Sequence, residues 1–230
     1  MKEGKFIVIE GTDGSGKTEQ FKVLLQRLRK NDFKVETVDF PQYNKPSSYF
    51  IKQYLSGFYG DWRDVGAHKA SLFYALDRYE ASFKIREWLK CGKLVLSNRY
   101  VGSNLGHQGL KIKDQKNRRK FFKWIEDLEY GTLSIPKPDL NIFLHMPAEI
   151  AYFLIKKRKK KEYLKNKKRD IHEKDLSHLK QAEKIYLEVA KIFRNDFKTI
   201  ECVERGRLLS IQEISGKVWV IVREFLGINS

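Results

Sequence analysis

A glycine-rich stretch, GTDGSGKT, follows the apolar run FIVIE close to the start of the 230-residue chain. It fits the pattern G-x-x-x-x-G-K-[ST], in which a strand enters a tight loop and the loop opens a helix. Glycines permit backbone angles closed to other residues, so successive N–H groups converge on phosphate oxygens at the positive end of the helix dipole. Lys17 is expected to reach the β- and γ-phosphates, and the Thr18 hydroxyl to bind Mg²⁺. The stretch predicts a nucleoside-triphosphate site made of Gly11, Thr12, Asp13, Gly14, Ser15, Gly16, Lys17 and Thr18.

Short apolar runs alternate with segments of helical length along the rest of the chain. Five runs rich in Val, Ile and Phe predict strands over 6–10, 35–40, 93–98, 139–145 and 197–203. Apolar stripes and stop signals predict helices over 18–30, 66–90, 173–193 and 211–225. This alternation predicts a parallel sheet covered by helices with right-handed crossovers. We therefore expect residues 1–230 to form a single three-layer α/β/α domain around a five-stranded parallel sheet.

Composition bears on partners and compartment. The formal net charge is +17, and residues 156–169 hold ten basic side chains against one acidic one. Such a bias suits nucleic acid or a nucleotide, and solvated helix faces account for it equally well. Cys91 and Cys202 lie far apart, outside any C-x-x-C spacing, and the first apolar run is too short for a signal peptide or a membrane span. We expect a cytoplasmic protein with no membrane partner.

The third predicted strand ends in SNRY, residues 97–100. Ligands of open α/β sheets bind at the carboxyl ends of the strands, so Arg99 is expected to lie beside the glycine-rich loop. Two phosphate-binding groups at one crevice indicate two phosphorylated substrates. The sequence holds no N-K-x-D stretch of the kind that a GTPase uses to read guanine.

Four stretches in chain order resemble the thymidylate kinase family: EGTDGSGKT, DFPQY, SLFYALDRYE and SNRYVGSNLGHQG. PKPDLNIFLH and RDIHEKDLSHLKQAEKIYLEVA follow in the order that the family has. The resemblance spans nearly the whole chain and implies a P-loop NTPase fold with a helical lid. It further implies phosphorylation of dTMP to dTDP with ATP and Mg²⁺, in dTTP biosynthesis. It also implies a homodimer, with the helix over 66–90 as a candidate interface.

The resemblance also implies the residues that bind the acceptor. Arg99 would bind its phosphate, since a planar guanidinium matches phosphate in a bidentate way, and Arg78 would hydrogen-bond the base. Tyr74 falls on the aromatic that stacks on thymine, with Phe73 beside it, and core packing is the alternative for both rings. The other positions are Asp13 at the sugar and phosphate, Phe40 and Pro41 at the wall beside the sugar, and Ser103 and Gln108 at the pyrimidine edge.

One departure from the family pattern concerns the metal. Asn98 stands before Arg99, where the family has an aspartate that helps to hold Mg²⁺. Asparagine can hold a metal-bound water but adds no charge. Glu10 or Asp13 is therefore expected to compensate.

A second departure concerns the transferred phosphoryl group, because the glycine-rich loop has no basic residue besides Lys17. The chain thus resembles the members of the family that supply this charge from a mobile lid, which would span about residues 156–172. Arg158, in preference to Arg169, would clamp the γ-phosphate as an arginine finger does. Asp170 and Glu173 would organise the base of the lid.

The expected catalytic residues are therefore Lys17, Arg99, Arg158 and Asp13. The acceptor phosphate is already an anion, so no strong general base is needed, and His107 is expected only to line the pocket. Two alternatives within enzymes are a deoxynucleoside kinase, which needs a carboxylate base, and another nucleoside monophosphate kinase. An ATP-dependent nucleic-acid-binding protein is the distant alternative. We expect no nucleic-acid partner, because the acceptor residues would have no role there.

Overall fold

The computed structural model describes residues 3–162 and 176–228 and, for residues 158–162, the backbone alone. The strands are β1 (Lys5–Gly11), β2 (Val35–Asp39), β3 (Leu94–Asn98), β4 (Leu140–His145), β5 (Phe197–Glu201), β6 (Val203–Glu204) and β7 (Arg207–Leu208). The α-helices are α1 (Lys17–Lys30), α2 (Tyr49–Leu55), α3 (Trp62–Lys90), α4 (Val101–Gly109), α5 (Gln115–Glu126), α6 (Ala148–Glu162), α7 (Leu176–Ile192) and α8 (Ile211–Leu226). A 3₁₀ turn, η1 (Pro46–Ser48), precedes α2, and a π-helical turn, η2 (Asp127–Thr132), follows α5.

The central sheet has the order β2-β3-β1-β4-β5, and all of its strands are parallel. The prediction of a five-stranded parallel sheet is confirmed. β1 lies in the middle, and its register places Ile9 beside Asn98 of β3 and Gly11 beside Leu144 of β4. The carboxyl ends of these strands therefore meet at one edge, where the glycine-rich loop leaves the sheet. The predicted strand over 197–203 is interrupted at Cys202, and β6 pairs with β7 in a separate hairpin.

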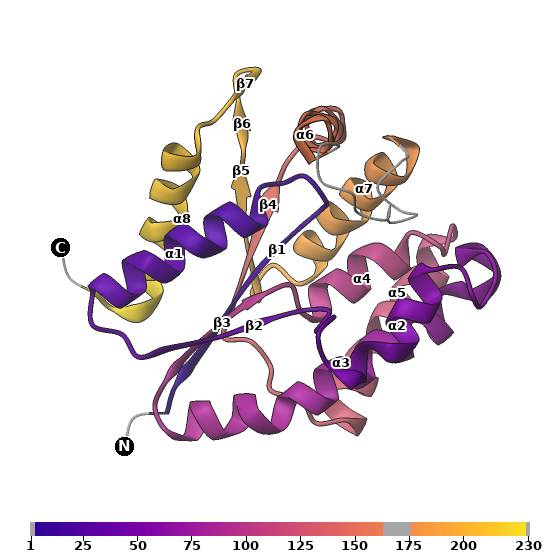
Figure 1. Cartoon of the computed structure of the whole chain (residues 1–230), viewed down its shortest axis with the longest axis horizontal. Coiled ribbons are helices and arrows are strands. Elements are labelled where there is room, and N and C mark those ends of the chain that lie inside the picture. The colour runs from indigo at the N-terminus through magenta and orange to yellow at the C-terminus, as the bar shows by residue number, and fades with distance from the viewer. Residues whose placement is uncertain (1–2, 163–175, 229–230) are drawn as a thin grey trace.

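Helices cover both faces of the sheet, as the prediction of three layers requires (Figure 1). Side chains alternate along a strand, so Phe6 and Val8 of β1 enter one core, while Ile7 and Ile9 enter the other. Helices α3, α4, α5 and α7 cover the first core, and α1 and α8 cover the second. All four of these β1 side chains are fully buried, which explains why the strand reads as a continuous apolar run.

Three α-helices of the structure, and the first part of another, were not predicted: α2, α4, α5 and the start of α6. α4 carries glycines at 102, 106 and 109, a composition that disfavours a helix on propensity alone. The helix over 66–90 is present and starts earlier, at Trp62, with a break in its helical angles at Gly66. α7 begins at Leu176, within the range predicted for its helix.

The predicted lid, about residues 156–172, lies mostly outside the described residues. α6 contributes the backbone of 156–162, and α7 resumes at Leu176. Across residues 3–162 and 176–228, none of the helices combines the length and the apolar character that a bilayer crossing requires. Cys91 and Cys202 are both free.

Candidate active site

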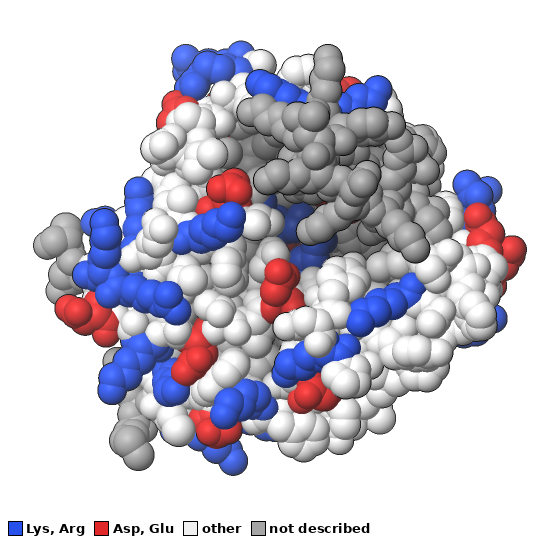
Figure 2. All heavy atoms as spheres, in the orientation of Figure 1, with Lys and Arg blue, Asp and Glu red and all other residues white. Residues whose placement is uncertain are grey.

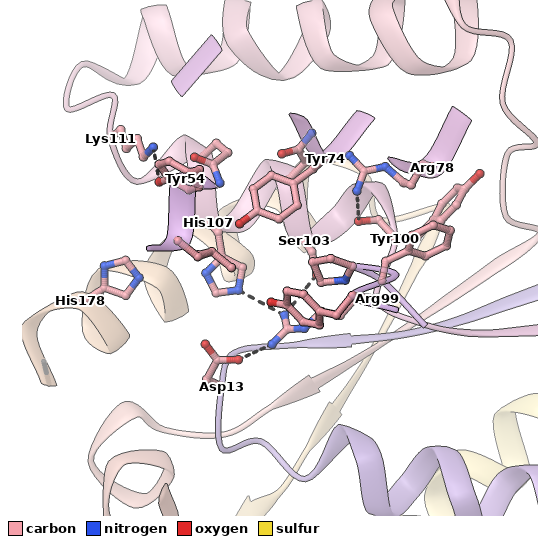
Figure 3. Close-up of a pocket in the computed structure, with 16 residues that line it drawn as sticks. Asp13, Tyr54, Tyr74, Arg78, Arg99, Tyr100, Ser103, His107, Lys111 and His178 are labelled. Atoms are coloured by element: carbon pink, nitrogen blue, oxygen red, sulfur yellow. Dashed lines mark hydrogen bonds and ion pairs between the residues drawn. The ribbon is translucent and has the colours of Figure 1, made fainter. Parts of the chain in front are cut away.

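A cavity opens where the glycine-rich loop, the end of β3 and the helices α3 and α4 meet (Figure 3). Asp13 and Arg99 lie at one end of it in this view, next to the loop, and Tyr74 and Arg78 lie at the other end. Its lining residues are Asp13, Phe40, Pro41, Tyr43, Tyr54, Leu55, Tyr74, Arg78, Arg99, Tyr100, Ser103, Asn104, His107, Gln108, Lys111 and His178.

The glycine-rich loop has the geometry of an anion cradle. Gly14 and Gly16 have φ values of 80° and 85°, in the left-handed region that favours glycine, and α1 begins at Lys17. The hydroxyls of Thr12 and Ser15 are buried with no hydrogen-bond partner. Buried polar groups in proteins are normally paired, so these two hydroxyls are suited to bind a ligand.

Lys17 lies inside this cradle, and its side chain turns back toward the backbone of the loop. Its Nζ donates to the carbonyl of Thr12 at 2.6 Å. Burial, reinforced by the nearby charge of Arg99, lowers the pKa of Lys17 to about 7. An anion in the loop would replace the missing solvation and favour the charged form.

Arg99 connects the loop with the cavity. It takes a positive φ of 67° directly after β3, which turns its side chain toward the loop. The guanidinium forms an ion pair with Asp13, and its Nη1 donates to the carbonyl of Gly11 and to Ser103 Oγ, both at 3.2 Å. Burial raises the pKa of the Asp13 carboxyl, but Arg99 and Lys17 outweigh it and hold the pKa below its usual range.

His107 lies on the cavity side of Arg99, 3.2 Å from its Nη1. The guanidinium can only donate, so the imidazole Nε2 accepts in this contact. Burial, and then the positive charge of Arg99, hold the pKa of His107 well below its usual value despite Asp13. The structure thus places a neutral histidine on the cavity wall.

The two aromatic candidates of α3 face different ways. Tyr74 lines the cavity, whereas Phe73 does not. The Phe73 ring packs against Phe50 at 5.8 Å and Tyr59 at 5.4 Å between ring centroids. Adjacent residues of a helix point about 100° apart, so one of the pair had to face away.

Arg78 lies at the same end of the cavity, and a carboxylate outside the cavity lining binds its guanidinium. Its Nε and Nη2 each donate to a carboxylate oxygen of Glu129 at 2.6 Å, and both side chains are almost completely buried. Burial disfavours its charge, but Glu129 outweighs burial and keeps the pKa of Arg78 above its usual value. Phe40, Pro41, Ser103 and Gln108 line the cavity too, and the Gln108 side-chain oxygen is buried without a partner.

The two carboxylates expected to compensate for Asn98 are already engaged. Asp13 pairs with Arg99, and Glu10 accepts from the backbone of Tyr100 at 2.7 Å and from the Ser103 hydroxyl at 2.7 Å. The carboxylate beside Asn98 belongs instead to Asp39, whose Oδ1 accepts from Asn98 Nδ2 at 2.9 Å. Burial raises the pKa of Asp39, while Asn98, Arg99 and Lys17 oppose this shift.

Several lining residues have no counterpart in the sequence prediction. Lys111 follows α4 and donates to the Tyr54 hydroxyl at 2.9 Å and to the Gly66 carbonyl at 3.2 Å, and burial lowers its pKa to about 8. Asn104 and the supporting Glu129 were also missed. No local motif marks Lys111 or Glu129, because helices distant in the chain bring them to the site, whereas Asn104 lies within the stretch SNRYVGSNLGHQG that the sequence already singles out.

The predicted lid residues fall outside the described part of the site. The backbone of Arg158 lies in α6, but its side chain is not among the described ones. Arg169, Asp170 and Glu173 lie between the described ranges.

Comparison with known proteins agrees with the architecture. The family model for thymidylate kinase matches residues 9–208. The thymidylate kinase of Mycobacterium tuberculosis is 30% identical over 185 residues, which cover 80% of this chain and 85% of that protein. The Dictyostelium discoideum enzyme is 28% identical over 220 residues, covering 90% and 93% of the two chains.

Among solved structures, thymidylate kinase from Candida albicans superposes with a TM-score of 0.73 at 20% identity, covering 99% of this chain and 96% of its own. At that identity the likeness shows the fold alone. The family match covers most of the chain, and the relative from Mycobacterium tuberculosis matches most of both sequences. The chain belongs to the thymidylate kinase family of nucleoside monophosphate kinases.

Proposed function

We propose that the protein transfers the γ-phosphoryl group of ATP to the 5′-phosphate of dTMP and so forms dTDP. The observation that carries this proposal is the ion pair between Asp13 and Arg99. Asp13 belongs to the triphosphate loop, and Arg99 lines the cavity that opens beside it. One guanidinium thus joins the donor loop to the acceptor cavity, as transfer between two bound phosphates requires.

ATP binds in the loop, with its phosphates on the backbone N–H groups and on Lys17. The buried hydroxyls of Thr12 and Ser15 have no partner within the protein, which suits a loop that binds phosphate together with its counter-ion. Mg²⁺ therefore fits the same cradle, and the hydroxyl of the exposed residue Thr18, at the start of α1, would bind the metal. The metal neutralises charge on the phosphates when it is bound. Asp39, next to Asn98, is the carboxylate best placed to support it.

The acceptor lies in the cavity with its phosphate on Arg99 and its base toward Tyr74. Phe40 and Pro41 form the wall beside the sugar, and Ser103 and Gln108 lie along the base. The acceptor phosphate needs no base to activate it, which fits a His107 that burial keeps neutral. Catalysis then rests on positioning and on charge, supplied by Lys17, Arg99 and the basic lid with Arg158.

The enzyme acts as a homodimer through one face of α3. Leu72, Leu76, Tyr79 and Phe83 recur at spacings of four, three and four residues, and all four are exposed. A continuous apolar stripe of this kind on a surface helix marks an interface.

This proposal does not include a nucleic-acid site. On the face drawn in Figure 2, the described lysines and arginines are interspersed with acidic side chains rather than gathered in one stripe. Basic side chains also lie in the hollow at the centre of this face, where a nucleotide phosphate would be bound.

The test is a panel of acceptors offered singly with ATP and Mg²⁺: dTMP, dUMP, dCMP, dGMP and thymidine. We expect ADP formation with dTMP and none with thymidine. Lys17→Ala is the control, since it removes the loop cation and should abolish transfer in a folded protein. Activity on thymidine alone would overturn the proposal in favour of a nucleoside kinase.

A further inference from the structure

A fully buried carboxylate, that of Glu129, lies behind the base end of the cavity. It belongs to the π-helical turn η2, where the N–H of Leu133 bonds to the carbonyl of Leu128 five residues earlier, at 2.8 Å. Such turns insert one residue into a helix and are frequent at functional sites. Glu129 is 0% exposed and does not itself line the cavity.

Glu129 binds two cavity residues at once. Its Oε2 accepts from Arg78 Nε, and its Oε1 accepts from both Arg78 Nη2 at 2.6 Å and Asn104 Nδ2 at 3.0 Å. Arg78 comes from α3 and Asn104 from α4, and each is only 2% exposed. One carboxylate therefore fixes two side chains that separate helices bring to the cavity.

The bidentate pair leaves one nitrogen of Arg78, Nη1, that does not contact Glu129. Nη1 has a single long contact, 3.5 Å to the carbonyl of Tyr100, at the end of the cavity where Tyr74 also lies (Figure 3). The guanidinium is planar, so fixing Nε and Nη2 on Glu129 also fixes the direction of the Nη1 hydrogens. This part of the cavity presents a donor.

The same carboxylate determines which way the Asn104 amide points. Nδ2 donates to Glu129 and to the carbonyl of Ser71 at 3.2 Å, so Oδ1 is the acceptor that remains. This oxygen is buried and has no partner. An unpaired buried acceptor is unfavourable, and a bound N–H group would remove that cost.

We propose that Glu129 is a positioning residue that sets the hydrogen-bond polarity of the base site, a donor from Arg78 beside an acceptor from Asn104. The inference rests on the proposed function. A pyrimidine with a 4-oxo group and an N3–H, such as thymine or uracil, satisfies both groups. Cytosine offers an amino group and a bare N3 instead, so it opposes donor with donor and acceptor with acceptor.

Buried polar groups left unpaired give strong discrimination, so the wild-type protein should favour dTMP over dCMP by about 10³-fold or more in kcat/KM. The diagnostic variant is Glu129→Gln. Glutamine offers one oxygen and one NH₂ group in place of two acceptor oxygens, so Arg78 loses its bidentate partner and the Asn104 amide is free to rotate. The dTMP:dCMP ratio should fall by about 30-fold or more, while KM for ATP changes by less than about threefold. Glu129→Asp, which keeps the charge, should recover part of the ratio.

The matched control is Glu188→Gln. It weakens another deeply placed arginine–glutamate pair, in which Arg118 of α5 contacts Glu188 of α7 at 2.7–2.9 Å outside the cavity lining. A stability loss without a change in the dTMP:dCMP ratio is expected there. If Glu129→Gln does not fold, Asn104→Ala removes the acceptor with Glu129 in place and should lower the same ratio.

The outcomes separate this inference from the proposed function. A folded Glu129→Gln variant that keeps the wild-type ratio would overturn the positioning role. Equal use of dTMP and dCMP by the wild-type protein would overturn the inferred polarity and leave the kinase intact. Inactivity on every monophosphate would overturn the proposed function itself, and equilibrium binding of dTMP against dCMP would then still measure the polarity of the cavity.

Discussion

At the scale of single residues, the pKa of Lys17 is expected to change when a charged ligand binds in the loop. Burial is the main cause, and the positive charge of Arg99 the second, that lowers the pKa of Lys17 to about 7 in the free protein. In the proposed function, the phosphates of ATP would bring negative charge within reach of Lys17 and raise this pKa. Binding therefore takes up a proton wherever the free lysine is partly neutral, above about pH 7, and the uptake disappears below about pH 6.

This uptake can be measured by titration calorimetry of a non-hydrolysable ATP analogue in buffers with different ionisation enthalpies. Lys17→Met is expected to abolish the uptake at about pH 8. Lys111→Met is the matched control, because Lys111 has a pKa lowered to about 8 by burial but lies on the cavity rather than in the loop. Uptake that persists in Lys17→Met would assign the proton to another group.

Residues that belong to local motifs could be placed at the site from the sequence. Asp13, Lys17 and Arg99 lie where the loop and the end of the third strand predict, because the register of parallel strands brings these ends together. It could not choose between Phe73 and Tyr74, since that choice depends on how α3 is rotated against the sheet.

The missed residues share a physical cause. Glu129 and Lys111 touch the site only because α5, η2 and the turn after α4 pack beside α3. Contacts between helices far apart in the chain leave no periodic trace in a single sequence. The compensating role expected of Glu10 stays a prediction, and in the structure Glu10 Oε1 accepts from the backbone N–H groups of Tyr100 and Ser103 at the start of α4.

At the scale of elements, α4 explains why a glycine-rich stretch became a helix. A Cβ at Gly106 would lie 2.3 Å from the ring of Tyr186, which is buried and stacks on Phe143 at 5.3 Å between centroids. α4 needs glycine in order to approach α7, and this tertiary gain outweighs its poor helix propensity. Propensity therefore failed to predict this helix.

The substitution Gly106→Ala tests that packing. The Tyr186 ring has no room to retreat, so we expect a loss of about 1–3 kcal/mol in the free energy of unfolding, measured by urea titration. Gly216→Ala in α8 is the matched control, since a Cβ there meets nothing within 4 Å. It should stabilise the helix by about 0.5–1 kcal/mol, and a similar loss in both variants would contradict the packing explanation.

A second prediction at this scale concerns His145 at the end of β4. Its two ring nitrogens contact Glu201 at 2.6 Å and Glu183 at 2.9 Å, and Glu183 also accepts from the backbone N–H of Ala148 at the start of α6. Burial lowers the pKa of His145, but the two carboxylates outweigh it and raise the pKa above its usual value. The protonated histidine thus joins β5 and α7 to the end of β4.

A pKa raised by folding stabilises the protein below the unfolded value of about 6.5, and this stabilisation is lost as the pH rises through the folded pKa. The difference in unfolding free energy between wild type and His145→Gln should therefore shrink as the pH rises above about 6.5. At the acid end we expect this difference in unfolding free energy to be about 1 kcal/mol, because Glu201 is half exposed and water screens its charge. Glu201→Gln should narrow the pH window, and a difference that grows with pH would contradict the assignment.

At the scale of the whole molecule, one helix serves two surfaces. α3 turns Tyr74 and Arg78 toward the cavity, while Leu72, Leu76 and Phe83 remain exposed at 39%, 47% and 59%. A partner molecule covering the exposed face would immobilise α3 and with it the wall of the base site. The proposed dimer and the proposed acceptor site are therefore linked through the same backbone.

Leu76→Arg tests this link, because a charge in the middle of the stripe cannot be buried without a partner and should separate the subunits. Sedimentation equilibrium should give a dimer for the wild type and a monomer for the variant. The monomer should bind dTMP less tightly, with KM raised by about tenfold, and ATP about equally well. Val220→Arg is the control, since Val220 is 55% exposed on α8 over the opposite face of the sheet, and it should change neither mass nor KM. A wild-type monomer, or a Leu76→Arg variant that remains a dimer, would contradict the α3 interface. The rigidity of the base site would then come from Glu129 and the packing of the core, without a contribution from a partner molecule.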